Sequence, residues 1–282
     1  MEIKKVGIIA NCDKEHAVEH SRRLSDWLLE RGIDVCFDKE IADRVDGVEG
    51  VERSELGPMV DIIVVFGGDG TLLTAARAVK KLGVPLVGVN LGGFGFMTVI
   101  GLHEMFDAME MILVGKFDTS KRMMLEASVG GVGHSALNDI VVTRGGLSKM
   151  VNLETFVDGK YLTTYKADGL IISTPTGSTG YSLSAGGPIV KPEHYSIIIT
   201  PICPHTLTNR PIMLPPEVSI DVVVLTPEEG ISVTLDGQNL FMLKSGDRVR
   251  VKKSPCDINL VNSPHHDYWE ILRTKLGWGG LP

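Results

Sequence analysis

A short apolar run that ends in a glycine-rich turn constrains the fold of this chain more than any other feature. Ile62–Phe66 reads IIVVF, which is wholly apolar and mostly β-branched, and this predicts a strand buried on both faces in a parallel sheet. Strand-like runs at Lys5–Ala10, Asp34–Phe37 and Pro85–Val89 alternate with segments of helical spacing at His16–Arg31, Leu72–Leu82 and Leu102–Gly115. The alternation predicts a doubly wound, Rossmann-like α/β domain.

Strand signals dominate the rest of the chain. Asp158-Gly159 and Asp236-Gly237 each separate two strand-like runs, which is the sequence signature of a short β-hairpin. The acidic stretch Asp38–Gly57 has no clear periodicity and is predicted to be a mobile surface connection. We predict three segments: an α/β domain at 1–117, a mostly antiparallel all-β domain at 118–259, and a tail at 260–282 that returns to the first domain and carries a helix at Tyr268–Leu276.

Charge and cysteine content narrow the function classes. The chain has 28 Lys+Arg against 35 Asp+Glu and a net charge of −7, so it lacks the basic field that nucleic acids or anionic membranes attract. Its four cysteines include no CxxC pair, which argues against a zinc site or a disulfide framework and favours the cytoplasm. Val84–Leu102 and Leu170–Val190 are uncharged but dense in glycine, which suits close approach of main chain to a ligand better than a membrane span.

The turn Gly67-Gly68-Asp69-Gly70-Thr71 follows the apolar strand and precedes a helix. In open α/β sheets ligands bind at the carboxyl ends of strands, and backbone N–H groups of glycines at a helix N-terminus attract phosphate. The turn matches neither the GxxxxGK[ST] loop nor GxGxxG. Asp69 would repel a phosphate unless it acts on a hydroxyl or a metal ion. The alternative is a purely structural tight turn in which Asp69 caps the helix.

These residues resemble a known kinase superfamily. Gly67–Thr71 resembles the GGDGT motif shared by NAD kinases, diacylglycerol-type lipid kinases and, more distantly, phosphofructokinases. The block Thr176–Pro188 closely resembles the GSTAYSLSAGGP block of NAD kinases, and Asn138-Asp139, Pro204–Leu207 and Arg210-Pro211 also match their pattern. The resemblance runs from Val6 to about Asn262 and is to the NAD kinase (ATP–NAD kinase) family. One departure is Gly180, where the family more often has Ala.

The resemblance implies transfer of the terminal phosphoryl of ATP to the 2′-hydroxyl of the adenosine ribose of NAD. Asp69 would orient that hydroxyl and collect its proton late, because positioning matters more than early deprotonation in phosphoryl transfer. Gly68, Gly70 and Thr71 would line the triphosphate. Mg²⁺, or another divalent cation, is implied by the charge of the donor, and the sequence does not identify its protein ligands.

Residues of the second domain are the candidates for NAD binding. Asn138 and Asp139 offer acceptors and an amide for the ribose and adenine, or else form a polar turn. Lys166 and Asp168 share a face of a strand, where they are suited to the pyrophosphate and the nicotinamide carboxamide. Lys149 is either a further ligand or a solvated surface lysine, and Gln238 is a candidate from the far side of the cleft. The densest segment offers Tyr181 for adenine stacking, together with Ser178, Thr179, Gly180, Ser182, Leu183 and Ser184.

Two alternatives remain open from the sequence. A diacylglycerol-type lipid kinase would share GGDGT but needs a membrane-facing surface, which this acidic chain supports poorly. A non-catalytic dinucleotide sensor would use the same cleft but gains nothing from a carboxylate beside a phosphate. The resemblance also implies a homodimer or homotetramer. It leaves open whether the phosphoryl acceptor is NAD or NADH, and whether the donor is ATP or polyphosphate.

Overall fold

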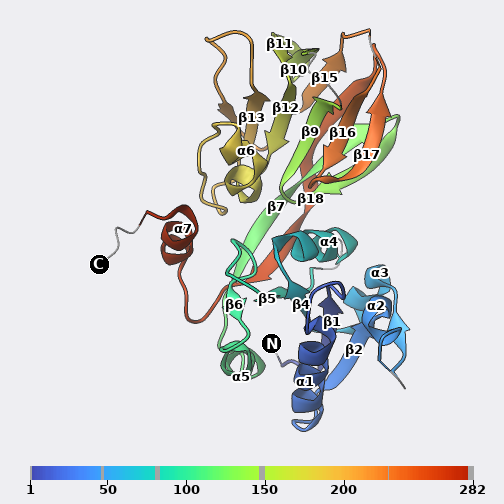
Figure 1. Cartoon of the computed structure of the whole chain (residues 1–282), viewed down its shortest axis with the longest axis vertical. Coiled ribbons are helices and arrows are strands. Elements are labelled where there is room, and N and C mark those ends of the chain that lie inside the picture. Colours follow the sequence, from blue (N-terminus) through green and yellow to red (C-terminus); the bar gives the residue numbers. More distant parts are fainter. Residues whose placement is uncertain (1, 46–47, 80–82, 146–149, 228, 279–282) are drawn as a thin grey trace. The chain divides into compact units, whose positions relative to one another are not determined.

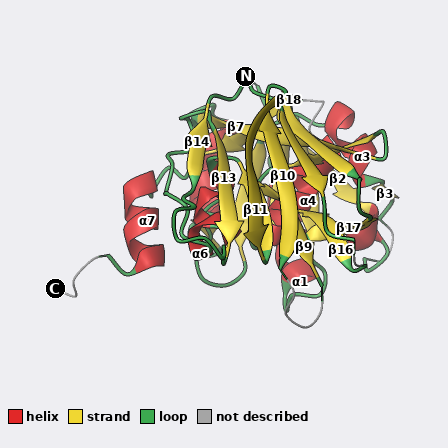
Figure 2. Cartoon of the chain, turned by 90° about the horizontal axis from the view of Figure 1, so that it is seen from above, coloured by secondary structure: helices red, strands yellow, loops and turns green. Residues whose placement is uncertain are grey.

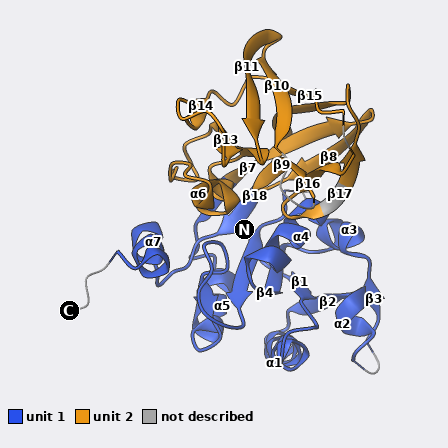
Figure 3. Cartoon of the chain, turned by 45° about the horizontal axis from the view of Figure 1, so that its top comes forward, with its two compact units in different colours: residues 1–121, 258–282 blue, residues 122–257 orange. Residues whose placement is uncertain are grey.

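The computed structural model describes residues 2–45, 48–79, 83–145, 150–227 and 229–278. Contacts divide the chain into two compact units, which are coloured separately in Figure 3. Unit 1 contains Met1–Lys121 and Ile258–Pro282, and unit 2 contains Arg122–Asp257. The chain enters unit 2 along strand β7 (Thr119–Val129) and leaves it along strand β18 (Arg248–Val261). Unit 2 is therefore an insertion into unit 1, and each unit is described by itself.

Unit 1 is built on a parallel sheet in the order β5-β4-β1-β2-β3, and this confirms the predicted α/β domain. The short strand β6 pairs with β5, and so does the end of β18, where Leu260 lies opposite Leu86. The strands are β1 (Lys5–Ala10), β2 (Asp34–Asp38), β3 (Gly50–Val51), β4 (Ile62–Gly67), β5 (Leu86–Asn90) and β6 (Ile100–Gly101). The helices, visible in Figure 1, are α1 (Ala17–Leu29), α2 (Lys39–Ala42), α3 (Arg53–Leu56), the 3₁₀ turn Gly57–Met59, α4 (Asp69–Val79), α5 (Met105–Leu113) and α7 (Tyr268–Leu276).

Burial explains why β4 is central. All five side chains of Ile62–Phe66 have zero exposure, as expected for a strand covered on both faces. Helix α1 packs one face inward, with Leu24 and Leu28 fully buried. After α1 the chain turns at Gly32, whose φ of 74° lies in the left-handed region that glycine adopts without strain.

The prediction of a mobile connection at Asp38–Gly57 was wrong for the described residues of that stretch. They form α2, β3 and α3, held together by the carboxylate of Asp38, which has zero exposure. Asp38 caps α2 by accepting the N–H of Ile41 at 3.2 Å and pairs with Arg53 at 2.6 Å. The sequence pattern did not reveal this order because it depends on an ion pair between side chains that are distant along the chain.

Unit 2 consists almost entirely of antiparallel strands, which are yellow in Figure 2, and this confirms the predicted β-rich domain. One sheet has the order β14-β13-β12-β9-β16-β17, and β11, β10, β15 and β18 pair in that order in the other. Both Asp-Gly pairs form the predicted hairpin turns, with positive φ at Asp158, Gly159, Asp236 and Gly237. The remaining elements are β8 (Val132–Ala136), β9 (Asp139–Arg144), β10 (Val151–Val157), β11 (Lys160–Ala167), β12 (Gly169–Ser173), β13 (Ile197–Ile202), β14 (Ile212–Leu214), β15 (Ile220–Val224), β16 (Ile231–Leu235), β17 (Gln238–Leu243), the 3₁₀ helix η2 (Thr176–Thr179) and α6 (Tyr181–Ser184).

Within the described part of the chain, no helix has the length and apolar character needed to cross a membrane.

Candidate active site

The glycine turn of unit 1 joins β4 directly to α4. The helix begins at Asp69, three residues before the predicted start at Leu72, so the Asp69 carboxylate belongs to its first turn. A Cβ on Gly67 would lie 2.3 Å from Oγ1 of Thr71, which shows that Thr71 packs onto this turn. Cβ atoms at Gly68 and Gly70 would meet nothing within 4 Å, so the backbone there is open to a ligand.

The Asp69 carboxylate is held by residues about thirty positions further along the chain. Its Oδ2 accepts the N–H of Phe96 at 2.8 Å, and its Oδ1 accepts the N–H groups of Met97 at 3.1 Å and Thr98 at 3.0 Å. The hydroxyl of Thr98 also donates to Oδ1 at 3.0 Å. Because a carboxylate oxygen has about two lone pairs, Oδ1 is saturated and Oδ2 keeps room for one further donor.

The segment that holds Asp69, which we call the 90–98 loop, is itself fixed by short bonds. Asn90 donates from Nδ2 to Oγ1 of Thr98 at 2.7 Å and accepts the N–H of Gly92 at 2.7 Å. A Cβ on Gly95 would lie 2.1 Å from Oδ1 of Asp69, so only glycine lets the loop approach the carboxylate this closely. The only sequence signal for this loop was the uncharged, glycine-dense composition of Val84–Leu102.

The two glycine segments enclose a pocket of about 320 Å³, which Asp69 lines together with Gly67, Gly68, Gly92 and Gly93. Backbone N–H groups and the N-terminus of an eleven-residue helix give this pocket the character of an anion site. A carboxylate placed at its wall is suited to a substrate hydroxyl that must be brought beside a phosphate.

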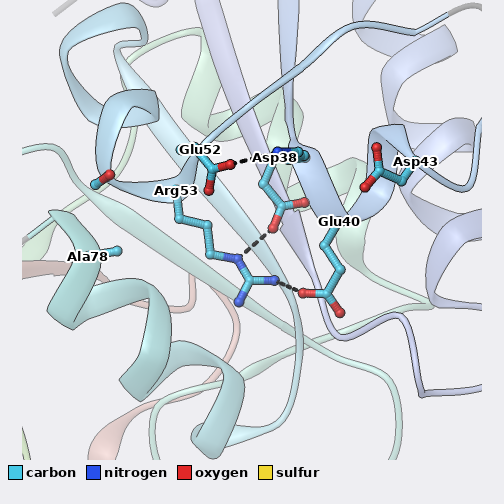
Figure 4. A pocket seen from close by; sticks show the side chains of 8 residues that line it. Asp38, Glu40, Asp43, Glu52, Arg53 and Ala78 are labelled. Atoms are coloured by element: carbon cyan, nitrogen blue, oxygen red, sulfur yellow. Dashed lines mark hydrogen bonds and ion pairs between the residues drawn. The ribbon is translucent and has the colours of Figure 1, made fainter.

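A second pocket of unit 1, of about 550 Å³, has a different chemistry (Figure 4). The guanidinium of Arg53 lies between the carboxylates of Asp38 and Glu40 and pairs with both. Burial raises the pKa of Asp38 above its ordinary value, against the opposing bond from Arg53. With Asp43 and Glu52 also in its wall, this pocket would repel a phosphate.

In unit 2 the predicted pair Asn138-Asp139 lies at the start of β9 and is organised by Asp236. The carboxylate of Asp236 accepts three successive N–H groups, from Leu137 at 3.1 Å, Asn138 at 2.7 Å and Asp139 at 3.2 Å. Asp139 is 5% exposed, and burial together with the negative charge of Asp236 raises its pKa to about 7. A carboxyl group in this state can donate a hydrogen bond as well as accept one.

Several polar atoms near this pair have no partner within the part of the chain that the structure describes. Oδ1 of Asn138, Oγ of Ser173 and Oγ1 of Thr176 are buried and make no hydrogen bond. Ser173 lies opposite Asp139 in the sheet, and Gly177 packs so closely on Asn138 that a Cβ there would lie 2.2 Å from its carbonyl oxygen. Unpaired buried polar atoms are costly, so a group of them indicates a place for a polar ligand.

The segment 178–184 divides into internal and outward-facing residues. Ser178 is fully buried and its hydroxyl bonds to Pro175 and to both backbone groups of Val190, while the hydroxyl of Ser182 bonds to Thr200 at 2.9 Å. Tyr181 is 46% exposed. The other predicted residues of the segment are Thr179, which bonds to the Thr176 carbonyl, Gly180, the partly exposed Leu183 and the exposed Ser184.

The remaining predicted residues are not gathered at this point. Lys166 is the penultimate residue of β11 and Asp168 immediately precedes β12, whereas Ser173 and its neighbour Asp139 lie at the other end of β12. At about 3.3 Å per residue, the five steps from Asp168 to Ser173 span roughly 16 Å. Gln238 follows the Asp236-Gly237 turn and is exposed. Lys149 lies outside the described residues.

Comparison with known proteins decides the family. The ATP-NAD kinase N-terminal domain matches residues 6–117, and the ATP-NAD kinase C-terminal domain matches residues 137–263. The chain belongs to the ATP-NAD kinase family. The NAD kinase of Geotalea daltonii is 46% identical over 282 residues, covering 98% of this chain and 99% of the relative, and that of Geobacter sulfurreducens is 45% identical with the same coverage.

Solved structures of ATP-NAD kinase relatives share the fold. A yeast NADH kinase complexed with NADH superposes with a TM-score of 0.91 at 26% identity, covering 100% of this chain and 89% of the yeast one. An NAD kinase from Archaeoglobus fulgidus in complex with ATP superposes with a TM-score of 0.78 at 24% identity, covering 98% and 100%.

The donor set of this ATP-NAD kinase family member fits a metal carried by its substrate. No group of three or more His, Cys, Asp or Glu side chains within the described ranges is arranged to hold a metal ion. Among the residues described around this pocket, Asp69 supplies the only carboxylate, and most of its acceptor positions are taken by N–H groups. Mg²⁺ often keeps several waters and binds chiefly to phosphate oxygens, which suits such a site.

Proposed function

We propose that this enzyme transfers the terminal phosphoryl of ATP to the 2′-hydroxyl of the adenosine ribose of NAD and so makes NADP. The observation that carries the proposal is the Asp69 carboxylate, fixed through Oδ1 with one acceptor position of Oδ2 left at the wall of a glycine-lined pocket. Oδ2 accepts the hydrogen bond of the 2′-hydroxyl and so orients the hydroxyl oxygen toward the phosphorus. It takes the hydroxyl proton as the new oxygen–phosphorus bond forms. A divalent cation bound with ATP would offset the charge of the phosphates.

Unit 2 is proposed to hold the NAD. Asn138 and Asp139 present amide and carboxyl groups to the adenine and ribose, and the exposed ring of Tyr181 offers a face for the base. The unpaired oxygens of Ser173 and Thr176 add two polar positions that the sequence did not single out. We keep the predicted division of labour, with catalysis in 1–117, NAD binding and subunit contacts in 118–259, and a returning tail in 260–282.

A homo-oligomer, dimeric or tetrameric, is part of the same proposal. Lys166 and Asp168 lie near one end of β12, and Asp139 lies beside the other end. Within one copy, these two groups of residues would therefore contact different ends of a long ligand. A second copy that supplied one of the two groups would complete the site. We also propose a cytoplasmic location, which the four free cysteines support because thiols persist in reducing compartments.

The test is NADP formation from NAD, ATP and Mg²⁺, followed with a dehydrogenase that accepts only NADP. Asp69→Asn should abolish turnover while NAD binding, measured by calorimetry, stays near that of the wild type, because the carboxylate positions the hydroxyl rather than the whole cofactor. Asp43→Asn, in the second pocket of the same unit, is the matched control and should leave turnover unchanged. Undiminished turnover in Asp69→Asn would refute the assigned role.

The same assay separates the alternatives. Phosphorylation of a diacylglycerol without NADP formation would indicate a lipid kinase, and NAD binding without any phosphoryl transfer would indicate a sensor. NADH beside NAD, and inorganic polyphosphate beside ATP, would establish the acceptor and the donor.

A further inference from the structure

Two lysines from opposite ends of the chain line the pocket beside Asp69. Lys14 lies in the turn after β1, and Lys275 lies in the last turn of α7. Among the residues that the structure describes, neither lysine has an ion-pair partner, and the only acidic side chain in the pocket is Asp69. The pocket therefore carries more positive than negative side-chain charge, in a chain that is acidic overall.

Lys14 is held close to the glycine turn by the backbone. The N–H of Asn11 bonds to the carbonyl of Phe66 at 2.9 Å, which ties the loop after β1 to the end of β4. The N–H of Lys14 then bonds to the carbonyl of Asn11 at 3.0 Å and closes a turn. The position of Lys14 thus follows that of the strand that leads into Gly67 and Asp69.

Lys275 is held by the contact of α7 with the 90–98 loop. Its Nζ lies 6.0 Å from the centre of the Phe96 ring, and the N–H of Phe96 is a donor to Asp69. At the other end of α7 the ring of His266 meets Phe94 edge-on at 4.8 Å between centroids. His266 is itself held, since its Nδ1 lies 3.0 Å from Glu270 in α7. The C-terminal helix therefore packs on the loop that positions the proposed catalytic carboxylate.

The remaining surface of the pocket indicates which anion these lysines would meet. A Cβ at Gly68 or Gly93 would find nothing within 4 Å, so backbone rather than side chains faces the space. The volume of about 320 Å³ is at the lower end for ligand pockets, which suits a short chain of phosphates better than a whole dinucleotide. Lysine ammonium groups are compact point charges that pair well with phosphate.

We propose that Lys14 and Lys275 bind the phosphate chain of the phosphoryl donor, so that the C-terminal helix α7 completes the donor site. This inference rests on the proposed function and names the residues that act on the donor. The ligand class is a linear polyphosphate, either the tail of a nucleoside triphosphate or inorganic polyphosphate. Lys14 and Lys275, which are far apart in the sequence, then hold one substrate in the pocket that Asp69 also lines.

The test compares Lys275→Gln and Lys14→Gln in the full chain with Arg273→Gln, which removes one positive charge from the same helix outside the pocket. Binding of ATP and of inorganic tripolyphosphate is measured by calorimetry, and KM for ATP and NAD by NADP formation. Each pocket variant should bind both phosphate ligands about tenfold more weakly at low salt, the loss of one charge-assisted contact. The KM for NAD should stay unchanged, and the deficit should shrink as salt is raised.

Each outcome bears on one claim. Wild-type affinity for both phosphate ligands in Lys14→Gln and Lys275→Gln would overturn this inference while leaving NADP formation intact. An equal loss in Arg273→Gln would also overturn it, because a general charge effect would then explain the result. Weaker binding of ATP alone, with tripolyphosphate unaffected, would contradict contact with the phosphate chain. Absence of NADP formation by the wild type, with tripolyphosphate still bound through the lysines, would refute the proposed function alone.

Discussion

Replacing Gly95 with alanine would place a methyl carbon where the Asp69 carboxylate now lies. The added Cβ would be 2.1 Å from Oδ1 of Asp69 and 2.4 Å from Oγ1 of Thr98. An ordinary contact is more than an ångström longer, so either the carboxylate or the loop must move by about that amount. The backbone cannot yield freely, because the N–H of Gly95 is bonded to the carbonyl of Thr98 at 3.0 Å.

The expected cost falls on turnover. A displacement of about 1 Å of a positioning group lowers kcat by roughly 100-fold, which corresponds to about 2.7 kcal/mol in the activation barrier. Overpacking of this kind also lowers the free energy of unfolding by roughly 1–3 kcal/mol. The KM values for ATP and NAD should change far less, since the glycine turn that we propose receives the phosphates is unaltered.

The assay is steady-state NADP formation by Gly95→Ala, with far-ultraviolet circular dichroism and thermal melting to establish that the variant is folded. Gly145→Ala is the control, because among the described residues the nearest atom to its Cβ would be the carbonyl oxygen of Gly230, at 3.9 Å. It should keep wild-type kcat. A folded Gly95→Ala enzyme with wild-type kcat would refute the claim that the 90–98 loop fixes the position of the carboxylate.

Three further predictions concern buried charge and stacking. In the folded protein Asp139 keeps its proton up to its pKa of about 7, whereas in the unfolded chain it loses the proton above about 3.8. Between these two pH values the free energy of unfolding of the wild type should therefore fall, relative to that of Asp139→Asn, by roughly 4 kcal/mol. Urea unfolding at about pH 5 and about pH 8 measures this, and a gap that does not widen with pH contradicts it. Arg53→Met leaves Asp38 buried without its partner and should lower the free energy of unfolding by roughly 3–5 kcal/mol in urea titrations, with part of the loss recovered by adding Asp38→Asn. Tyr181→Ala should weaken NAD binding by roughly 1–3 kcal/mol in calorimetry, and an unchanged affinity would mean that adenine stacks elsewhere.

Structural features that depend on a few neighbouring residues could be predicted from the sequence. The apolar run Ile62–Phe66 predicted a buried strand, which is β4. Each Asp-Gly pair predicted a hairpin turn from two residues alone, because such a turn needs positive φ at both positions. Strand β18 shows the limit. It runs from Arg248 to Val261, and Leu260 near its end pairs with Leu86 of β5. That pairing joins distant parts of the chain. Pro255 and Asp257 also interrupt the alternation of apolar and polar residues from which a strand would be predicted.

The candidate site divides in the same way. Asp69 stood out because an acidic residue in an anion-binding turn needs a chemical reason. The donors that hold it, Phe96 to Thr98, carry no motif of their own, since backbone N–H groups are present in every residue except proline. The roles of serine hydroxyls were harder still to predict from the sequence. Ser178 was predicted as a residue of the NAD site, and only the structure shows the three internal bonds of its hydroxyl.

The insertion of unit 2 into unit 1 also sets the order in which the protein can be completed as it is made. Ribosomes release Met1–Lys121 first, whereas the strand that borders β5 and the helix that carries Lys275 appear only after unit 2 has been made. Until then β6 pairs with β5 only at Val89 and Asn90, and the rest of that edge stays unpaired, which invites aggregation. A nascent chain stalled inside unit 2 would therefore hold a nearly finished parallel sheet with neither its final strand nor its second lysine.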